Sequence, residues 1–425
     1  MSVLRNERRA NKRLLLSTFN NLGQLKYSYF PFTKLRNITT KLTSIKYRNS
    51  EEEFPSKMTT AITATCACAS FSHSISFDNA SLPLPQIFCL CTDCRLTSGS
   101  CGNTYIPLPP SIPINISDFP TLIPYASSAE NLVRYFCGKC SAHIFCHRPR
   151  EKKWWLATGI WDRTEGILEW KGCKWVKGTG DGGASVWLNN IRDSDGNTRE
   201  LKRWLAEENG DVVADESFLR LPPKKKENQG EDRLKAQCHC GGVQFHITRP
   251  NEESTKVYSP FPDLMIPYNS TTSAKNPNIE PWFLRENNTK YLAGTCVCPS
   301  CRAQLGFEIQ TWAFIPKRNI FKPDGSPIDF NFGTLKRYYS SPGAYREFCG
   351  TCGANVFWHC DERPELLDVS IGILDPEEGA RVEGWLDWWT DRASFKELAV
   401  STTLVESLEA GMKEWGENKG HGKDA

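Results

Sequence analysis

The chain has 425 residues, of which 39% are hydrophobic and 24% charged, a composition typical of globular proteins rather than disordered ones. Its longest apolar run falls short of the roughly 18–20 residues that cross a bilayer, which predicts a soluble protein. The net charge of +3 is uneven, because residues 1–50 carry +10 and the remainder −7. An acidic body disfavours nucleic acid as the main partner, because phosphate binding requires a dense basic surface.

The basic leader, residues 1–59, is rich in Arg, contains Ser and Thr, and has Glu7 as the only acid among its first 50 residues. This composition is that of a mitochondrial transit peptide. A disordered extension and a gene model that starts too early are the alternatives. A secretory signal fits less well, because the apolar run at residues 14–16 is too short.

Two parts of the chain repeat each other motif by motif. At an offset of 212 residues, Arg134-Tyr-Phe-Cys137-Gly138-Lys-Cys140-Ser-Ala142 corresponds to Arg346-Glu-Phe-Cys349-Gly350-Thr-Cys352-Gly-Ala354. Gly159-Ile-Trp-Asp162 corresponds to Gly372-Ile-Leu-Asp375, Cys66-x-Cys68 to Cys238-x-Cys240, and Cys89-x-Cys91-x-x-Cys94-Arg95 to Cys296-x-Cys298-x-x-Cys301-Arg302. The conserved order indicates duplication of a whole domain. We expect a first module at residues 60–176, a linker with one helix at 177–232, a second module at 233–400 and a helical, charged tail at 401–425.

The hydrophobic pattern predicts a mainly β protein. Alternation at period two, as expected of half-buried strands, occurs at Val243, Phe245 and Ile247, and again at Leu367, Val369, Ile371 and Ile373. Helical spacing occurs in the linker at Leu201, Trp204 and Leu205, and near the C-terminus at Leu404, Leu408, Met412 and Trp415. We interpret both helical stripes as packing surfaces.

Cysteine spacing favours metal binding over disulfides. Fourteen of the 18 cysteines form C-x-C, C-x-C-x-x-C and C-x-x-C groups, each present once per module. Such groups bring several thiolates to one point, as tetrahedral zinc requires at about 2.3 Å per Zn–S bond. The other four, Cys101, Cys146, Cys173 and Cys360, do not correspond to one another and are expected to be ordinary thiols.

Seven cysteines per module divide into a set of four and a set of three. The C-x-x-C group, with Gly138 or Gly350 allowing a tight turn, is half of a four-cysteine zinc site whose other half is the C-x-C group. The C-x-C-x-x-C group then supplies three ligands and leaves one position open, as catalytic zinc sites do. A second structural zinc is the alternative, with a fourth ligand from His143, His147, His359 or Cys101.

The open site suits a thiol. Three thiolates around Zn²⁺ leave a net charge of −1, so the ion acidifies water poorly and accepts a fourth soft ligand. Arg95 and Arg302 follow the last cysteine of each set. They are expected to offset the negative charge or to hold a substrate carboxylate, or else to be solvated at the surface.

These motifs together resemble the glutathione-dependent formaldehyde-activating enzyme and centromere protein V family, over roughly 340 residues covering both modules. The resemblance implies two tandem zinc-stapled β-sandwich or β-tent domains and a carbon–sulfur lyase activity, which in the family forms S-hydroxymethylglutathione from glutathione and formaldehyde. It implies structural zinc at Cys66, Cys68, Cys137 and Cys140, and at Cys238, Cys240, Cys349 and Cys352. It implies catalytic zinc at Cys89, Cys91 and Cys94, and at Cys296, Cys298 and Cys301, for a total of about four Zn²⁺ per chain.

Some positions depart from the family pattern. The glycine that usually follows the first C-x-C is present as Gly241, whereas the first module has Ala69-Ser70. The usual Ser-Gly after the Arg survives as Ser98-Gly99 but becomes Gln304-Leu305-Gly306 in the second module, and the common His between the first two catalytic cysteines is Leu90 or Val297. Every metal ligand is retained, so zinc binding is a firmer prediction than any substrate.

Three functions remain open from the sequence. The leading hypothesis is an enzyme that acts on a thiol such as glutathione and on a small electrophile. The alternatives are a non-catalytic zinc-binding scaffold for chromatin or protein partners, and a thiol or metal sensor. Zinc thiolates require a reducing compartment, which predicts a cytoplasmic or nuclear protein, or a mitochondrial one if the leader is a transit peptide.

Overall fold

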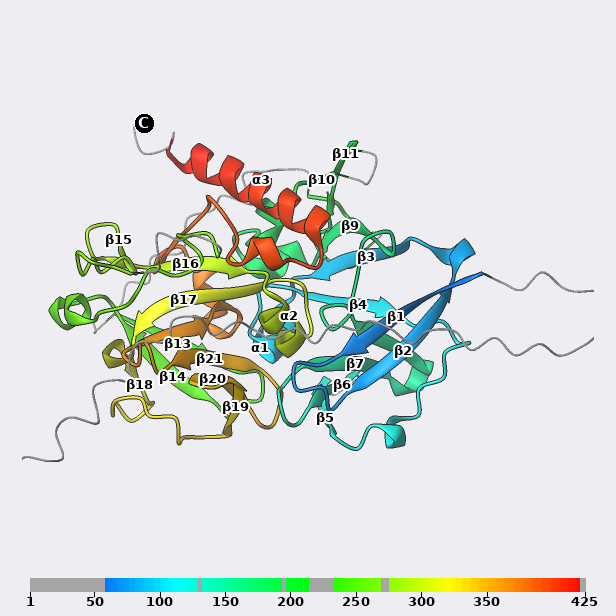
Figure 1. The fold of residues 1–425 in the computed structure, drawn as a ribbon, viewed down its shortest axis with the longest axis horizontal. Coiled ribbons are helices and arrows are strands. Elements are labelled where there is room, and N and C mark those ends of the chain that lie inside the picture. The colour runs from blue at the N-terminus through cyan, green and yellow to red at the C-terminus, as the bar shows by residue number, and fades with distance from the viewer. Residues whose placement is uncertain are drawn as a thin grey trace, which may run out of the picture. The chain divides into compact units, whose positions relative to one another are not determined.

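The computed structural model describes residues 58–128, 132–192, 196–208, 210–213, 232–268 and 275–420. Residues Lys57–Ala425 form one compact unit (Figure 1). Residues 1–57 of the predicted leader lie outside the described residues, and Thr59 already belongs to the first strand, β1 (Thr59–Thr65).

The first module is built around a large sheet of eight strands. In sheet order they are β12 (Lys202–Arg203), β9 (Leu168–Lys174), β3 (Leu84–Cys89), β4 (Asn103–Pro107), β8 (Lys153–Ala157), β7 (His143–Arg148), β6 (Leu132–Cys137) and β5 (Leu122–Ser128). The strands pair antiparallel from β3 to β5, whereas β9 runs parallel to both β3 and β12.

The second module has a large sheet of the same design. Its strands are, in order, β15 (Leu284–Arg285), β16 (Lys290–Cys296), β17 (Gln310–Pro316), β22 (Leu366–Ser370), β21 (Asn355–Cys360), β20 (Ala344–Cys349) and β19 (Leu335–Ser341), with β23 (Leu386–Trp388) parallel to β16. The order β9-β3-β4-β8-β7-β6-β5 therefore recurs as β23-β16-β17-β22-β21-β20-β19. The mainly β prediction is confirmed, and the second sheet repeats the first in all strands but β12 and β15.

Smaller elements complete the described part of the chain. The small sheets contain β1 (Thr59–Thr65) with β2 (Ser72–Asp78), β10 (Asn190–Arg192) with β11 (Thr198–Glu200), and β13 (Arg233–Gln237), β14 (Gln244–Thr248) and β18 (Ile320–Phe321). The α-helices are α1 (Thr92–Ser98), α2 (Pro299–Leu305) and α3 (Thr402–Gly420). None of these three helices is long and apolar enough to cross a membrane.

The strand predictions hold apart from one end of each. Phe245 and Ile247 are buried in β14, which begins one residue after the buried Val243, and Leu367 and Val369 are buried in β22. The predicted strand does not continue to Ile373, because β22 ends at Ser370 and a 3₁₀ turn, η9 (Ile371–Ile373), follows.

The predicted linker helix at Leu201, Trp204 and Leu205 is wrong. Leu201 and Trp204 are buried, but these residues flank the short strand β12, which pairs with β9. The backbone N–H of Trp204 donates to the carbonyl of Cys173, at 2.8 Å, so sheet hydrogen bonds occupy groups that a helix would need. A helical spacing of three apolar residues did not distinguish the two arrangements.

The predicted C-terminal helix is confirmed as α3. Leu404, Leu408 and Met412 are buried along one face and Trp415 is partly buried beside them. The helix packs on β10 and on the 3₁₀ segment Gly183–Val186, and Figure 1 shows it along one side of the unit.

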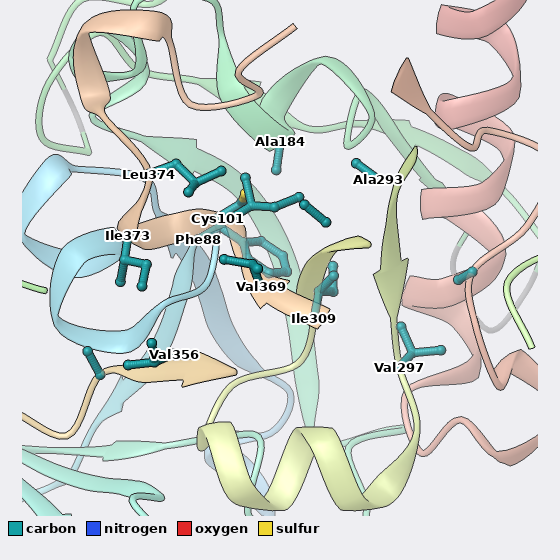
Figure 2. Packing of buried hydrophobic residues seen from close by; sticks show 14 of the residues in the cluster. Phe88, Cys101, Ala184, Ala293, Val297, Ile309, Val356, Val369, Ile373 and Leu374 are labelled. Atoms are coloured by element: carbon teal, nitrogen blue, oxygen red, sulfur yellow. The ribbon is translucent and has the colours of Figure 1, made fainter. Parts of the chain in front are cut away.

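One hydrophobic core joins both modules and the segment between them. Figure 2 shows Phe88 and Cys101 of the first module near Ala184 of the linker and Ile309 of the second module. The two modules are therefore not independently folded domains, because these side chains are buried only when both modules are present.

Each module also holds the short helix of the other through backbone hydrogen bonds. Near the end of α1, the carbonyl oxygens of Leu96 and Gly99 accept from the N–H groups of His239 and Gly372, each at 3.0 Å. At the equivalent positions of α2, those of Ala303 and Gly306 accept from Ala67 and Gly159, at 3.3 and 3.0 Å. The two helices are therefore clamped reciprocally.

The repeated glycines Gly159 and Gly372 make this contact sterically feasible. A Cβ atom on Gly159 would lie 2.3 Å from the backbone nitrogen of Phe307, and one on Gly372 would lie 2.3 Å from the carbonyl oxygen of Ser100. No L-residue with a side chain fits without moving one backbone away from the other.

Gly159→Ala and Gly372→Ala should therefore each lower the free energy of unfolding by about 1–3 kcal/mol, the usual cost of overpacking. Thermal denaturation followed by circular dichroism measures the effect. Gly178→Ala is the control, because its Cβ would meet no atom within 4 Å. Equal melting temperatures for all three variants would contradict the reciprocal clamp.

Candidate metal centres

The structure brings the two predicted four-cysteine sets together. In the first module, Cys66 and Cys68 follow β1, Cys137 ends β6, and Cys140 lies in the turn after it. All four sulfur atoms lie within 4.8 Å of one another, and the same holds for Cys238, Cys240, Cys349 and Cys352.

The spacing of these sulfurs fits zinc and not a disulfide. The Sγ atoms of Cys68 and Cys137 are 3.6 Å apart, and those of Cys240 and Cys349 are 3.4 Å apart. Ligands about 2.3 Å from a tetrahedral zinc lie about 3.8 Å from one another, whereas a disulfide requires about 2.0 Å. All eighteen cysteines of the chain lie in its described part, and all are free thiols.

We predicted from the sequence that Gly138 or Gly350 allows the tight turn of the C-x-x-C group. In the structure neither glycine has the left-handed conformation of this turn. The left-handed residues are Ser141 (φ 67°) and, in the second module, Gly353 (φ 82°). Gly138 instead allows a close approach, because its N–H donates to the carbonyl of Thr121 and a Cβ atom would lie 2.9 Å from Ile123.

In the first module, Ala69 stands where the family usually has glycine, and its backbone is left-handed, a conformation that strains a residue with a side chain. Ala69 has φ 55° where Gly241 has φ 73°. Next to it, the Ser70 hydroxyl lies 2.6 Å from the Cys68 sulfur. The turn is thus retained without glycine, and the departure from the family pattern leaves the four cysteines in place.

The predicted three-cysteine clusters also form, each at a strand-to-helix junction. Cys89 ends β3, Cys91 is the N-cap of α1, and Cys94 lies in its first turn. Cys296, Cys298 and Cys301 take the same positions at β16 and α2. The sulfur of Cys89 is 3.6 Å from that of Cys91 and 3.5 Å from that of Cys94, again the spacing of zinc ligands.

The residues proposed as a fourth ligand are engaged elsewhere. His143 Nε2 is 3.0 Å from the carbonyl oxygen of Thr97, the Cys101 sulfur is 3.2 Å from Thr311 Oγ1, and the ring of His147 stacks on Trp154. His359 Nε2 is 3.0 Å from Glu347. Among the described residues, no histidine, carboxylate or further cysteine joins either three-cysteine cluster.

The expectation that Arg95 and Arg302 are solvated is wrong, because both are buried. The charge of Arg95 does interact with Cys91 and Cys94, as expected, although its contacts are made elsewhere. Arg95 donates to the Leu90 carbonyl, and Arg302 forms an ion pair with the buried Glu308, with Nε 2.7 Å from the carboxylate. A side chain that follows Cys94 or Cys301 by one residue lies on a different helical face, so adjacency in sequence did not place it at the thiolates.

Two other arginines contact the thiolates, and the sequence reasoning had given them no role. Arg134 Nη2 donates to the Cys94 sulfur at 3.3 Å, and both Nη atoms of Arg346 are 3.5 Å from the Cys301 sulfur. Both are buried. Their signal was present in the repeat, because Arg134 and Arg346 open the duplicated Arg-x-Phe-Cys motif three residues before a zinc-site cysteine.

The pKa values follow this arrangement. Hydrogen bonds from Cys89 and Cys91, followed by the charge of Arg134, hold the pKa of the Cys94 thiol well below its usual value. Cys296, Cys298 and Arg346 act in the same way on the pKa of Cys301. Each buried guanidinium therefore stabilises a thiolate, and it offsets the −1 charge expected of zinc with three thiolates.

The two three-cysteine clusters differ in exposure. Cys89 and Cys91 are only partly buried, whereas Cys296, Cys298 and Cys301 are 5%, 8% and 6% exposed. The first cluster is thus the more accessible to a ligand from solvent.

The family profile described as glutathione-dependent formaldehyde-activating enzyme matches residues 61–175 and 284–392. The chain belongs to this family. The two matches fall on the two modules, consistent with tandem family domains, and they include both three-cysteine clusters. No curated protein matches the chain.

Zinc content should distinguish the two kinds of site. Wild-type protein is expected to contain about four zinc ions, and Cys91→Ser with Cys298→Ser should reduce this to about two while the fold is retained. Cys68→Ser with Cys240→Ser is the matched comparison and should lower the melting temperature, because these sites connect distant strands. Metal analysis and thermal denaturation provide both readouts. Unfolding of the Cys91/Cys298 variant would show that those clusters are structural as well.

Arg134→Gln should weaken zinc binding at the first three-cysteine cluster by about 10-fold or more, the usual effect of losing a hydrogen bond to a metal ligand. Competition with a coloured chelator measures the affinity. Arg148→Gln, which changes an exposed arginine on β7, serves as the control. Equal zinc retention by the two variants would remove Arg134 from the metal centre.

Proposed function

We propose that the protein is a zinc-dependent carbon–sulfur lyase that joins a thiol such as glutathione to a small aldehyde such as formaldehyde, and separates the adduct in reverse. The observation that carries the proposal is the three-cysteine cluster, whose sulfur spacing fits zinc and which no fourth described residue completes. Family membership supports the choice of glutathione and formaldehyde.

The cluster fits a zinc ion, with Cys89, Cys91 and Cys94 as ligands in the first module and Cys296, Cys298 and Cys301 in the second. When bound there, zinc would lower the pKa of a substrate thiol in the fourth position, so that the thiol is held as a thiolate at neutral pH.

The reaction needs no oxidant or reductant. The substrate thiol loses its proton to water, and a lone pair of its sulfur forms the new C–S bond with the carbonyl carbon. The carbonyl π electrons move to oxygen, which takes a proton from water. The reverse sequence breaks the C–S bond and regenerates thiol and aldehyde.

The protein's own contribution is to keep this site charge-balanced and shaped. Arg134 hydrogen-bonds to Cys94 through Nη2 and to Ser127 through Nε, at 3.1 Å, so its guanidinium is held on two sides. Burial would lower the pKa of Arg134, but the neighbouring Cys94 charge raises it, so the residue remains a cation. A fixed cation beside the thiolates limits the repulsion that an incoming thiolate meets.

A non-catalytic zinc scaffold is the second candidate function. Its specific support is the second three-cysteine cluster, where all three ligands are buried. A scaffold would bind zinc at all clusters without accelerating any reaction of glutathione.

Exchange NMR of glutathione with formaldehyde tests the proposal. Wild-type protein should raise the rate of adduct formation and breakdown above the spontaneous rate, and Cys91→Ser with Cys298→Ser should return it to that rate. Cys360→Ser, at a cysteine outside all clusters, should keep the wild-type rate. A wild-type rate equal to the spontaneous one would reject this reaction and favour the scaffold.

A further inference from the structure

The two large sheets place different side chains at corresponding positions beside the three-cysteine clusters. Cys89 pairs with Asn103 across β3 and β4, and Cys296 pairs with Gln310 across β16 and β17. Side chains two residues apart on a strand lie on the same face of the sheet. Two residues after Asn103, β4 has Tyr105, and two residues after Gln310, β17 has Trp312.

The same correspondence extends across each sheet to the arginine. Arg134 pairs with Cys146 on the neighbouring strand, whereas Arg346 pairs with Trp358. The first cluster is therefore flanked by a hydroxyl and a small thiol side chain, and the second by two indole rings.

Tyr105 has a buried hydroxyl group whose proton no described residue accepts. The Arg134 guanidinium, which can only donate, is the polar group that interacts with its oxygen. The Cζ atom of Arg134, whose guanidinium reaches Cys94, lies 5.9 Å from the centre of the Tyr105 ring. Phe307 packs against that ring edge-on, with the ring centres 4.9 Å apart, and so restricts its orientation. A buried hydroxyl whose proton has no acceptor is unfavourable, so a ligand that accepts its hydrogen bond binds more tightly than one that does not.

The hydroxyl is suited to donate. Burial raises the pKa of Tyr105 above its ordinary value, so the group stays protonated throughout the physiological range. An oxygen that becomes negative during addition of sulfur to a carbonyl is the acceptor that such a donor stabilises.

The second cluster is covered instead. Trp312, Trp358 and Phe395 pack against its cysteines. Phe395 is positioned by the preceding residue, because Val297 N–H donates to the Ser394 carbonyl at 3.1 Å, and the ring of Tyr268 lies next to it at 5.4 Å. This aromatic cover accounts for the low exposure of the three cysteines. Trp312, which corresponds to Tyr105 of the first module, has no hydroxyl group.

We propose that the two three-cysteine centres have different roles: the first is the site of turnover, with the Tyr105 hydroxyl donating a hydrogen bond to the oxygen of the electrophile, and the second is a closed metal site that takes no substrate. This division rests on the proposed lyase function. It makes Tyr105 a catalytic residue and limits each chain to one substrate thiol.

Isothermal titration of the zinc-loaded full chain with glutathione alone tests the closed site. The expected stoichiometry is about one glutathione per chain, because only one centre has an accessible fourth position. Trp358→Ala removes part of the cover and should raise the stoichiometry towards two. Two equivalent sites in the wild type would overturn the division of roles.

Exchange NMR and binding measured on Tyr105→Phe test the hydroxyl. The variant should keep its zinc and its affinity for glutathione, because the thiol position is untouched, while the exchange rate falls about 100-fold, the usual loss on removing one such donor. Tyr135→Phe, which removes a hydroxyl from strand β6 of the same sheet, should leave the rate unchanged. An unchanged exchange rate would overturn the assignment of Tyr105. A rate that falls only by half would also overturn it, because that is the result expected if both sites were equally active.

A stable adduct analogue gives a second readout without turnover. S-(2-hydroxyethyl)glutathione should bind wild-type protein up to about 10-fold more tightly than S-ethylglutathione, and Tyr105→Phe should lose this preference. Failure of the proposed function itself looks different, because the wild type would then not accelerate exchange at all. Equal affinity of the two analogues for an active wild type would overturn only the role of Tyr105.

Discussion

The reciprocal contact between the modules is the constraint on which the rest of the structure depends. The helix that carries two of the three thiolates in each module ends against the backbone of the other, with Gly99 opposite Gly372 and Gly306 opposite Gly159. This contact shares one core between the modules and fixes the helices that carry the thiolates. A chain with one module alone would leave both the helix end and the core face without their partners.

Charge is balanced locally around each centre, and this explains the placement of the buried arginines. Three thiolates in a buried cluster repel one another, and a guanidinium hydrogen-bonded to the sulfur of Cys94 or Cys301 lowers that cost. The buried arginines that follow the clusters in sequence, Arg95 and Arg302, donate to carbonyl groups and, for Arg302, to the carboxylate of Glu308. Duplication thus preserved the metal-binding chemistry of both centres, whereas the surrounding side chains diverged from Tyr105 to Trp312 and from Cys146 to Trp358.

Prediction from the sequence succeeded where residues close together in the chain act together. The cysteine groups, the order of the repeated motifs and the amphipathic helix α3 were all recognised, because their spacing of one to four residues is set by local backbone geometry. It failed where long-range pairing decides. Leu201 and Trp204 have helical spacing but join a sheet through β9, and Gly138 serves a contact with Ile123 rather than a left-handed turn.

The sequence alone determined the mainly β class, the duplication and the fourteen cysteines that form four clusters, because thiolate groups at these spacings have few other uses in a reducing compartment. Only the tertiary structure decided which arginines face the sulfurs, that no described side chain completes the three-cysteine clusters, and that one cluster is partly exposed and the other covered by aromatic rings. The physical reason is that these properties depend on strand register and on contacts between residues far apart in the chain, such as Cys94 with Arg134 and Val297 with Ser394. Spacing along the backbone does not encode them.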